Sequence, residues 1–440
     1  MSKVMNRRWS STLGGSGLPR KDTRPCEYEA YVPDPLVGRR VMLDGEVAAD
    51  VADAETAITR LNAEASVLVD TEALARILLR AEAVASSRIE GLVIGARRLL
   101  HAEVVRTLSE TPSDVTAHEV LNNIDAMVHA IQSIGAGDPI TSDLLLELHR
   151  RLLRGTRLED YGGHFREEQN WIGGSDYNPC SADFVPPPHE FVSDLITDLC
   201  EFCNTDDLPA VAQAAIAHAQ FETIHPFVDG NGRTGRALIH MVLRRRGIAE
   251  RVLPPVSLVL ATLARSYVDG LTAFRYAGSA TSQRALEGLN IWVGRFAGAC
   301  TRSVQDATAF EARAAEIEAS WRERLGSVRA NSATDRILRI LPGAPVLTVD
   351  GAARLISRTF NPANDAIQRL VGAGILRQVN IGRRNRAYEA PEIITVFTSL
   401  ERQLASPEGE TRTGDPLPLD RRQRVLLCRK AARGTSRGPL

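Results

Sequence analysis

The stretch from His225 to Arg236, HPFVDGNGRTGR, constrains the fold of this 440-residue chain more than any other segment. Apolar residues follow it at helical spacing, and a run of three arginines before Gly247 is typical of a helix end. We therefore expect a helix that begins near Asn231, with its first N–H groups facing the Asp-Gly-Asn-Gly turn. The apolar positions are Leu238, Ile239, Val242 and Leu243.

The start of such a helix is suited to binding an anion. Gly230 and Gly232 flank Asn231, so the backbone can bend until successive N–H groups converge. Arg233 and Arg236 are three residues apart and share one face of the helix. Two guanidiniums above converging N–H groups suit a chain of phosphates better than a single carboxylate.

Two further side chains give this stretch chemical capability. Asp229 is compatible with nearby phosphates if a divalent cation such as Mg²⁺ lies between them. His225 can accept a proton near neutral pH. Each feature alone is usually structural, because Gly-Asn-Gly is commonly a turn and arginines at this spacing commonly form a solvated face. Their combination indicates phosphoryl or nucleotidyl transfer.

The stretch resembles the signature of the Fic family, His-x-Phe-x-Asp/Glu-Gly-Asn-Gly-Arg-x-x-Arg, at every specified position. Fic proteins are mostly enzymes that move AMP from ATP to a Ser, Thr or Tyr hydroxyl of a target protein. The resemblance implies that His225 deprotonates the hydroxyl, that Asp229 holds Mg²⁺ and that Phe227 anchors the loop. The nucleotide-binding residues that it implies are Gly230, Asn231, Gly232, Arg233, Thr234, Gly235 and Arg236, with Tyr267 at the adenine pocket.

A helical pattern that starts at Thr71 ends in Ser86-Ser-Arg-Ile-Glu90-Gly91. Ser86 and Glu90 share one face, and Gly91 is a predicted C-cap. A glutamate at this end opposes the helix dipole and favours a cationic partner. Many Fic proteins carry an inhibitory helix with Ser/Thr-x-x-x-Glu-Gly/Asn. The resemblance implies that Glu90 pairs with Arg236 and blocks the γ-phosphate site, and Ser86 could hold the Glu90 rotamer.

Helical periodicity along the rest of the chain predicts an all-α fold with a small β-hairpin flap. Short apolar stretches between residues 162 and 188, divided by Gly, Asn and Pro, indicate the hairpin. Trp171-Ile172-Gly173-Gly174 resembles the Fic flap, which aligns the target segment by β-pairing. An ordinary loop between helices is the alternative. The predicted helices cover 47–61, 71–91, 97–108, 116–133, 141–154, 189–204, 208–223 and several segments from 256 to 325.

The segment 332–395 resembles a winged helix-turn-helix domain. Its pattern predicts helices over 332–341 and 348–356, a third that opens at Pro362 under an Asn361 cap, and a strand pair over 375–389. Arginines exceed acidic residues here, with Arg369 on the third helix and Arg383, Arg384 and Arg386 on the wing. We expect weak, salt-sensitive DNA contact through phosphates. A dimerisation or target-docking module is the alternative.

Domain boundaries and location follow from composition. We expect a flexible N-terminus over 1–30, an inhibitory helical region over 31–110, the Fic domain over 111–325 and a disordered basic tail over 405–440. The formal net charge is −1, and no run of 18 apolar residues or signal peptide is evident, so no membrane partner is expected. Cys200 and Cys203, a C-x-x-C within a helical pattern, are predicted to be core thiols, and the location to be cytoplasmic.

The sequence therefore predicts a protein adenylyltransferase that uses ATP and Mg²⁺ and is inhibited by its own Glu90. Two alternatives stay open. One is an enzyme of the same fold that removes AMP or works in both directions. The other is a DNA-binding regulator whose Fic unit senses a ligand. The target protein, the preferred nucleotide and the formation of a homodimer are left open by the sequence.

Overall fold

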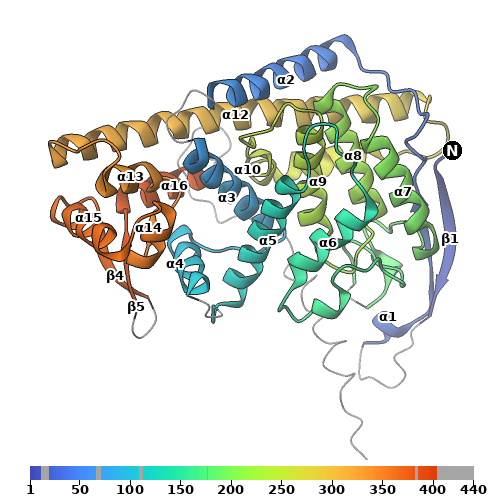
Figure 1. The fold of residues 1–440 in the computed structure, drawn as a ribbon. Coiled ribbons are helices and arrows are strands. Elements are labelled where there is room, and N and C mark those ends of the chain that lie inside the picture. Colours follow the sequence, from blue (N-terminus) through green and yellow to red (C-terminus); the bar gives the residue numbers. More distant parts are fainter. Residues whose placement is uncertain (11–18, 66–70, 109–111, 176, 382–384, 404–440) are drawn as a thin grey trace, which may run out of the picture.

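The computed structural model describes residues 1–10, 19–65, 71–108, 112–175, 177–381 and 385–403, and this part of the chain is helical apart from two small antiparallel sheets. Figure 1 shows that the long helix α12 (Gln283–Leu325) runs along one side of the molecule, with α2 (Gly45–Ala65) packed beside it. The N-terminal sheet lies at one end of the molecule and the C-terminal elements at the other. The all-α prediction is confirmed.

The predicted helices between these two ends are present, with boundaries within a few residues of those expected. They are α3 (Thr71–Ile89), α4 (Ala96–Thr107), α5 (Val115–Gln132), α6 (Ser142–Leu153), α7 (Val192–Cys203), α8 (Ala210–Ile224), α9 (Asn231–Arg245), α10 (Val256–Thr262) and α11 (Ala264–Phe274). Three short 3-10 helices lie between α6 and α7: η1 (Glu159–Tyr161), η2 (Pro179–Ser181) and η3 (His189–Phe191). No helix in the described ranges is both long and apolar enough to cross a bilayer.

The N-terminal residues form structure that the sequence analysis did not predict. Strand β1 (Lys3–Trp9) pairs antiparallel with β2 (Cys26–Val32), and a short helix, α1 (Arg20–Thr23), precedes β2. The prediction of a flexible segment over 1–30 is therefore wrong for the residues described there. Alternating side chains of β1 are half-buried, but β1 gains its hydrogen bonds from a partner about twenty residues away, which local composition does not reveal.

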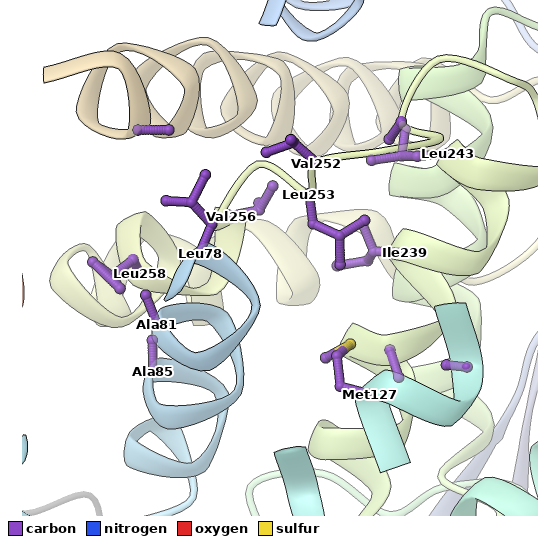
Figure 2. Close-up of a cluster of buried hydrophobic side chains, with 14 of the residues drawn as sticks. Leu78, Ala81, Ala85, Met127, Ile239, Leu243, Val252, Leu253, Val256 and Leu258 are labelled. Carbon is purple, nitrogen blue, oxygen red and sulfur yellow. The ribbon is translucent and has the colours of Figure 1, made fainter. Parts of the chain in front are cut away.

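A common core fixes the relative positions of the helices that carry the two predicted motifs. Figure 2 shows side chains of α3, α5 and α9 meeting those of α10 and the turn before it. All of these side chains are buried, and burial of apolar surface stabilises by roughly 25 cal/mol per Å². The end of α3 is thereby held against the start of α9. The labelled residues are Leu78, Ala81, Ala85, Met127, Ile239, Leu243, Val252, Leu253, Val256 and Leu258.

The C-terminal elements contain the three predicted helices and the predicted strand pair. They are α13 (Ala333–Ile340), β3 (Val346–Leu347), α14 (Val349–Leu355), α15 (Phe360–Gly372), β4 (Arg377–Ile381), β5 (Asn385–Glu389) and α16 (Pro391–Gln403). The three strands form an antiparallel sheet in the order β3-β5-β4, and β3 and α16 were not predicted.

Two details of this region differ from expectation. The N-cap of α15 is Thr359 rather than Asn361, which lies in the first helical turn. Arg369 donates hydrogen bonds to the carbonyls of Leu325 (3.2 Å) and Ser327 (2.7 Å), so it links α15 to the end of α12. Arg383 and Arg384 of the predicted wing, and the predicted tail over 405–440, lie outside the described residues. The winged-helix assignment, the domain boundaries and DNA binding stay predictions.

Cys26 and Cys180 form a disulfide that joins β2 to η2 across 154 residues of sequence. Cys200 and Cys203 are free and buried, as predicted. Burial raises the pKa of Cys200 to about 12 and holds that of Cys203 well above its usual value. Disulfides persist in oxidising compartments and are rare in the cytosol. The cysteines therefore do not support the cytoplasmic location, which stays a prediction.

Candidate active site

The loop between α8 and α9 carries the predicted motif, and three of its residues shape it. His225 follows α8 in the left-handed region (φ 50°), which is uncommon for a residue with a side chain, and Gly230 precedes α9 at φ 78°. The side chain of Asn231 accepts from the N–H of Phe227 (2.8 Å) and donates to its carbonyl (2.9 Å). The Asn231 side chain thus closes the loop, and only its backbone is left for the predicted anion hole.

Phe227 anchors the loop as predicted, because its side chain is fully buried. The ring of His149, on α6, stacks on it with 3.8 Å between the centroids. The N–H of Gly163 donates to His149 Nδ1 (3.1 Å), so the ring proton is on Nε2, which donates to the carbonyl of Asp229 (2.9 Å). Burial lowers the pKa of His149 to about 4, and this neutral imidazole therefore persists at physiological pH.

Two side chains from the segment after α6 donate hydrogen bonds to the carbonyls of His225 and Phe227. Arg166, which is buried, donates from Nε to the carbonyl of His225 (2.9 Å). Asn170 donates to the carbonyls of His225 (3.2 Å) and Phe227 (3.1 Å). These bonds hold the backbone of His225 in its unusual conformation, so the imidazole is presented from a rigid loop.

His225 has the protonation state that a general base requires. Burial lowers its pKa to about 3, and the nearby positive charges of Arg166 and Arg275 act in the same direction. The imidazole is therefore unprotonated at neutral pH and free to accept a proton. Its Nδ1 atom is buried and lies 3.8 Å from a carboxylate oxygen of Glu222.

Arg233 and Asp229 form an ion pair at the start of α9, with 3.1 Å between Arg233 Nη2 and Asp229 Oδ2. Arg233 is 3% exposed, and within the described residues its Nε and Nη1 atoms are buried without a hydrogen-bond partner. An unpaired buried donor of this kind costs roughly 1–3 kcal/mol. The guanidinium is thus poised for an additional acceptor, as its predicted role with phosphate requires.

Arg236 makes the predicted contact with the inhibitory segment. Its Nη2 atom donates to Glu90 Oε1 and to the carbonyl of Ser86, both at 2.8 Å, and its Nε donates to Ser86 Oγ at 2.9 Å. Ser86 was expected to hold Glu90, but it holds the arginine instead, because its hydroxyl faces α9. Burial acts to lower the pKa of Arg236, but Glu90, Tyr267 and Glu222 together outweigh it, and the pKa is raised overall.

The carboxylate of Glu90 occupies the anion-binding start of α9. A Cβ atom added to Gly232 would lie 1.9 Å from Glu90 Oε1 and 2.8 Å from Arg236 Nη1. Gly91, at φ 76°, turns the chain after α3 as predicted, and its N–H bonds to the carbonyl of Arg88 (2.8 Å). The position predicted for a phosphate is therefore filled by a carboxylate from the same chain.

Three other predicted nucleotide-binding residues are buried in helices. Thr234 is buried in α9, and a Cβ on Gly235 would meet Glu222 Oε1 at 2.8 Å, so Gly235 permits close packing of α8 against α9. Tyr267 is buried on α11, where its hydroxyl lies 2.8 Å from His218 Nε2. Their roles toward a nucleotide stay predictions, and the described geometry gives Gly235 a packing role.

The predicted hairpin flap is reduced to one bridge between Ile172 and Phe184. The N–H of Ile172 donates to the carbonyl of Phe184 at 2.8 Å, and Phe184 returns a bond at 3.1 Å. Gly173 and Gly174 both have positive φ, and a Cβ on either would lie about 2 Å from atoms of Asp183 or Ser181. Trp171 is tied down by a bond from its indole N–H to Ser175 (2.8 Å). Longer strands are prevented by this tight double-glycine turn.

The residues at the loop fit a magnesium ion in one respect. Asp229 has a side chain that is 42% exposed, and it offers the hard carboxylate oxygen that Mg²⁺ takes together with phosphate oxygens. Within the described residues, no group of three His, Cys, Asp or Glu side chains could hold a metal ion without such a partner. Asp229 is therefore the residue that would hold Mg²⁺ beside a nucleotide.

Sequence reasoning missed two charged residues beside His225. Glu222 lies one turn earlier on α8, and Arg275 follows α11 with its guanidinium 3.5 Å from the ring centroid of Phe184. Arg275 thus stacks on the flap, and burial lowers its pKa to about 10. The spacing from Glu222 to His225 is a signal that could have been read, whereas nothing in the sequence places Arg275 here.

Comparison with known proteins finds two matching family models. Residues 139–243 match the Fic/DOC family, and residues 48–132 match the Fic/DOC family N-terminal region. The protein adenylyltransferase fic-1 of Caenorhabditis elegans is 34% identical over 135 residues, which are 30% of this chain and 24% of that protein. The protein adenylyltransferase Fic of Drosophila virilis is 36% identical over 140 residues, which are 31% and 27%.

This chain spans about a quarter of the length of these curated relatives. Among solved structures, a Fic family protein from Desulfovibrio desulfuricans G20 is 20% identical, with a TM-score of 0.49, and the match covers 82% of this chain and 98% of that one.

Proposed function

Since this chain carries a Fic/DOC family domain preceded by the N-terminal region of that family, we propose that it transfers AMP from ATP to a Ser, Thr or Tyr hydroxyl of a target protein. Two relatives with the same domain are named protein adenylyltransferases. The observation that carries the proposal is the ion pair between Glu90 and Arg236, because it places a carboxylate where the motif provides for a phosphate. The described conformation is then the inhibited one.

The proposed reaction uses residues already placed by the loop. His225 takes the proton of the target hydroxyl, and the hydroxyl oxygen forms a bond to the α-phosphorus of ATP. The bond from that phosphorus to the bridging oxygen breaks, and pyrophosphate leaves. Arg233 and Arg236 bind the phosphates, which they can do bidentately. Mg²⁺ held by Asp229 would offset the negative charge of the phosphates.

The flap supplies a way to present the hydroxyl. The backbone of Ile172 pairs with that of Phe184 in one antiparallel bridge. An extended target segment could pair with the outer edge of this bridge. Arg275 stacks on Phe184 of the flap, and its positive charge also acts on His225, so the flap lies near the base. A target bound along Trp171–Gly174 would therefore bring its hydroxyl to the base.

The proposal is tested with the Glu90→Ala protein and ATP, GTP, UTP and CTP, each labelled at the α-phosphate. We expect label from ATP on the chain itself or on lysate proteins, at Ser, Thr or Tyr. His225→Ala in this background should reduce labelling by ~10²–10⁴-fold, the usual contribution of a general base. Asp229→Ala should weaken metal-dependent nucleotide binding. Labelling that survives His225→Ala undiminished would rule out the proposed mechanism.

A further inference from the structure

Glu222 lies beside the base without the partners that a buried carboxylate normally has. The residue is 7% exposed, and its Oε2 atom is 3.8 Å from His225 Nδ1. Its Oε1 atom and His225 Nδ1 are both buried and lack a hydrogen-bond partner among the described residues. Buried polar groups left unpaired in one state of a protein are usually satisfied in another. The carboxyl group and the imidazole are adjacent, and a small shift or rotation of the carboxyl group would bring one of its oxygens into hydrogen-bonding distance of Nδ1.

Several charged and polar groups surround this carboxylate. Arg236 from α9 and Arg275 from the end of α11 face it with positive charge, whereas Glu90 faces it with negative charge. Tyr267 of α11 lies nearby and is affected by its charge. Gly235 leaves the space that the carboxyl group occupies. The site is thus shaped around a carboxyl group, and positive charge is available to favour its ionised form.

We infer that Glu222 is a positioning residue for His225. Its carboxylate holds the imidazole with the proton on Nδ1, so Nε2 is left to accept the proton of the target hydroxyl, and it then pairs with the imidazolium that forms. This inference rests on the proposed function. The backbone of Glu222 also acts on the ring, because its interaction with the imidazole raises the pKa of His225. His225 is then the base, and Glu222 is the carboxylate that orients it.

The charge state of Glu222 links this role to the inhibitory segment. Burial, assisted by the Glu90 carboxylate, raises the pKa of Glu222 to about 7, against the opposing effect of the positive charges of Arg236 and Arg275. Glu222 is therefore largely neutral below pH 7 while Glu90 is in place. A neutral carboxyl group stabilises an imidazolium poorly. Departure of Glu90 lowers the pKa of Glu222 and favours the carboxylate that the base requires.

The test measures kcat and the KM for ATP from pH 5.5 to 8.5 in the Glu90→Ala protein, with and without Glu222→Gln. We expect kcat of Glu90→Ala to rise with pH as Glu222 ionises; His225 titrates too low to contribute. Glu222→Gln should lower kcat by about 10-fold or more, toward the ~10²–10⁴-fold that the base itself supplies. It should remove the pH-dependent rise and leave the KM for ATP nearly unchanged. Glu222→Asp should restore part of kcat.

Controls separate this inference from the proposed function. Glu201→Gln, an exposed carboxylate on α7, should change neither kcat nor its pH profile. A Glu222→Gln protein with the kcat and pH profile of Glu90→Ala would overturn the inference, while loss of activity in His225→Ala would leave the proposed function standing. Inactivity of Glu90→Ala itself would overturn both. If Glu222→Gln does not fold, Glu222→Asp decides: an unchanged kcat and pH profile in this shorter carboxylate would overturn the inference.

Discussion

Under the proposed function, Arg236 binds Glu90 in the described conformation and a phosphate of ATP in the active one. It is 1% exposed, and in the described conformation it donates hydrogen bonds to Ser86 and Glu90. The carbonyl of Ser86 belongs to the last turn of α3, where carbonyls lack helical partners, so the guanidinium also caps the helix. A phosphate that takes the place of Glu90 would replace one of these bonds and leave the two to Ser86. Under the proposed function, the arginine therefore need not move when Glu90 leaves.

Glu389 presents a second buried charge, and its stability consequences can be predicted. The residue is fully buried on β5 and is held by Arg97 of α4 at 2.9 Å and by Arg377 of β4. Arg97→Ala or Arg377→Ala alone leaves one guanidinium to neutralise it. We expect the double variant to lose more free energy of unfolding than the two single variants lose together, because its buried carboxylate has lost both arginine partners. The total loss should be about 3–5 kcal/mol.

Urea unfolding of the two single variants, the double variant and Arg60→Ala measures this difference. Arg60 forms an exposed pair with Glu64 on α2, so its replacement should change the unfolding free energy little. Additive effects of Arg97→Ala and Arg377→Ala would contradict this prediction, because they would show that neither arginine compensates for the loss of the other.

At the scale of elements, most helices and the β4–β5 strand pair were predictable, whereas β1, β2 and β3 were not. The apolar stripes of α3 and α9 are local, and so is the left-handed turn at Gly91. The pairing of β1 with β2 and the disulfide from β2 to η2 depend on distant partners. The sequence also places the motif at the start of α9. It does not place Arg275, which follows α11, beside His225. Only a tertiary contact brings Arg275 to Phe184.

The disulfide between β2 and η2 should stabilise the chain measurably. Cys26→Ser, Cys180→Ser and the double variant all break the same bond, so each should lose the same free energy of unfolding. A closed loop of this length typically contributes about 2–5 kcal/mol. Denaturant unfolding with and without reductant measures it, and the reduced parent should match the variants. Equal stability of the oxidised parent and Cys26→Ser would contradict a contribution from this bond.

At the scale of the whole molecule, α3 connects the site to the C-terminal elements. One face, with Glu82, Ser86 and Glu90, contacts α9: Glu82 Oε1 lies 2.7 Å from His240 Nε2, with both residues fully buried. Another face meets the C-terminal elements, where Arg80 donates to the carbonyl of Gly343 at 3.2 Å. The sequence predicted the Glu90–Arg236 ion pair between α3 and α9 through a motif. It gave no sign that the C-terminal elements pack on the same helix, because no local pattern records that contact.

The most direct test of inhibition by the Glu90–Arg236 ion pair is the rate of AMP incorporation from labelled ATP. The rate is measured in the parent, in Glu90→Ala, and in Glu90→Ala combined with Arg236→Ala. We expect Glu90→Ala to label itself well above the parent, because the phosphate no longer competes with a carboxylate for Arg236. The combined variant should fall back below Glu90→Ala, because the guanidinium that holds the terminal phosphate is missing. A Glu90→Ala protein no more active than the parent, on itself or in lysate, would show that Glu90 is only a carboxylate at the end of a helix.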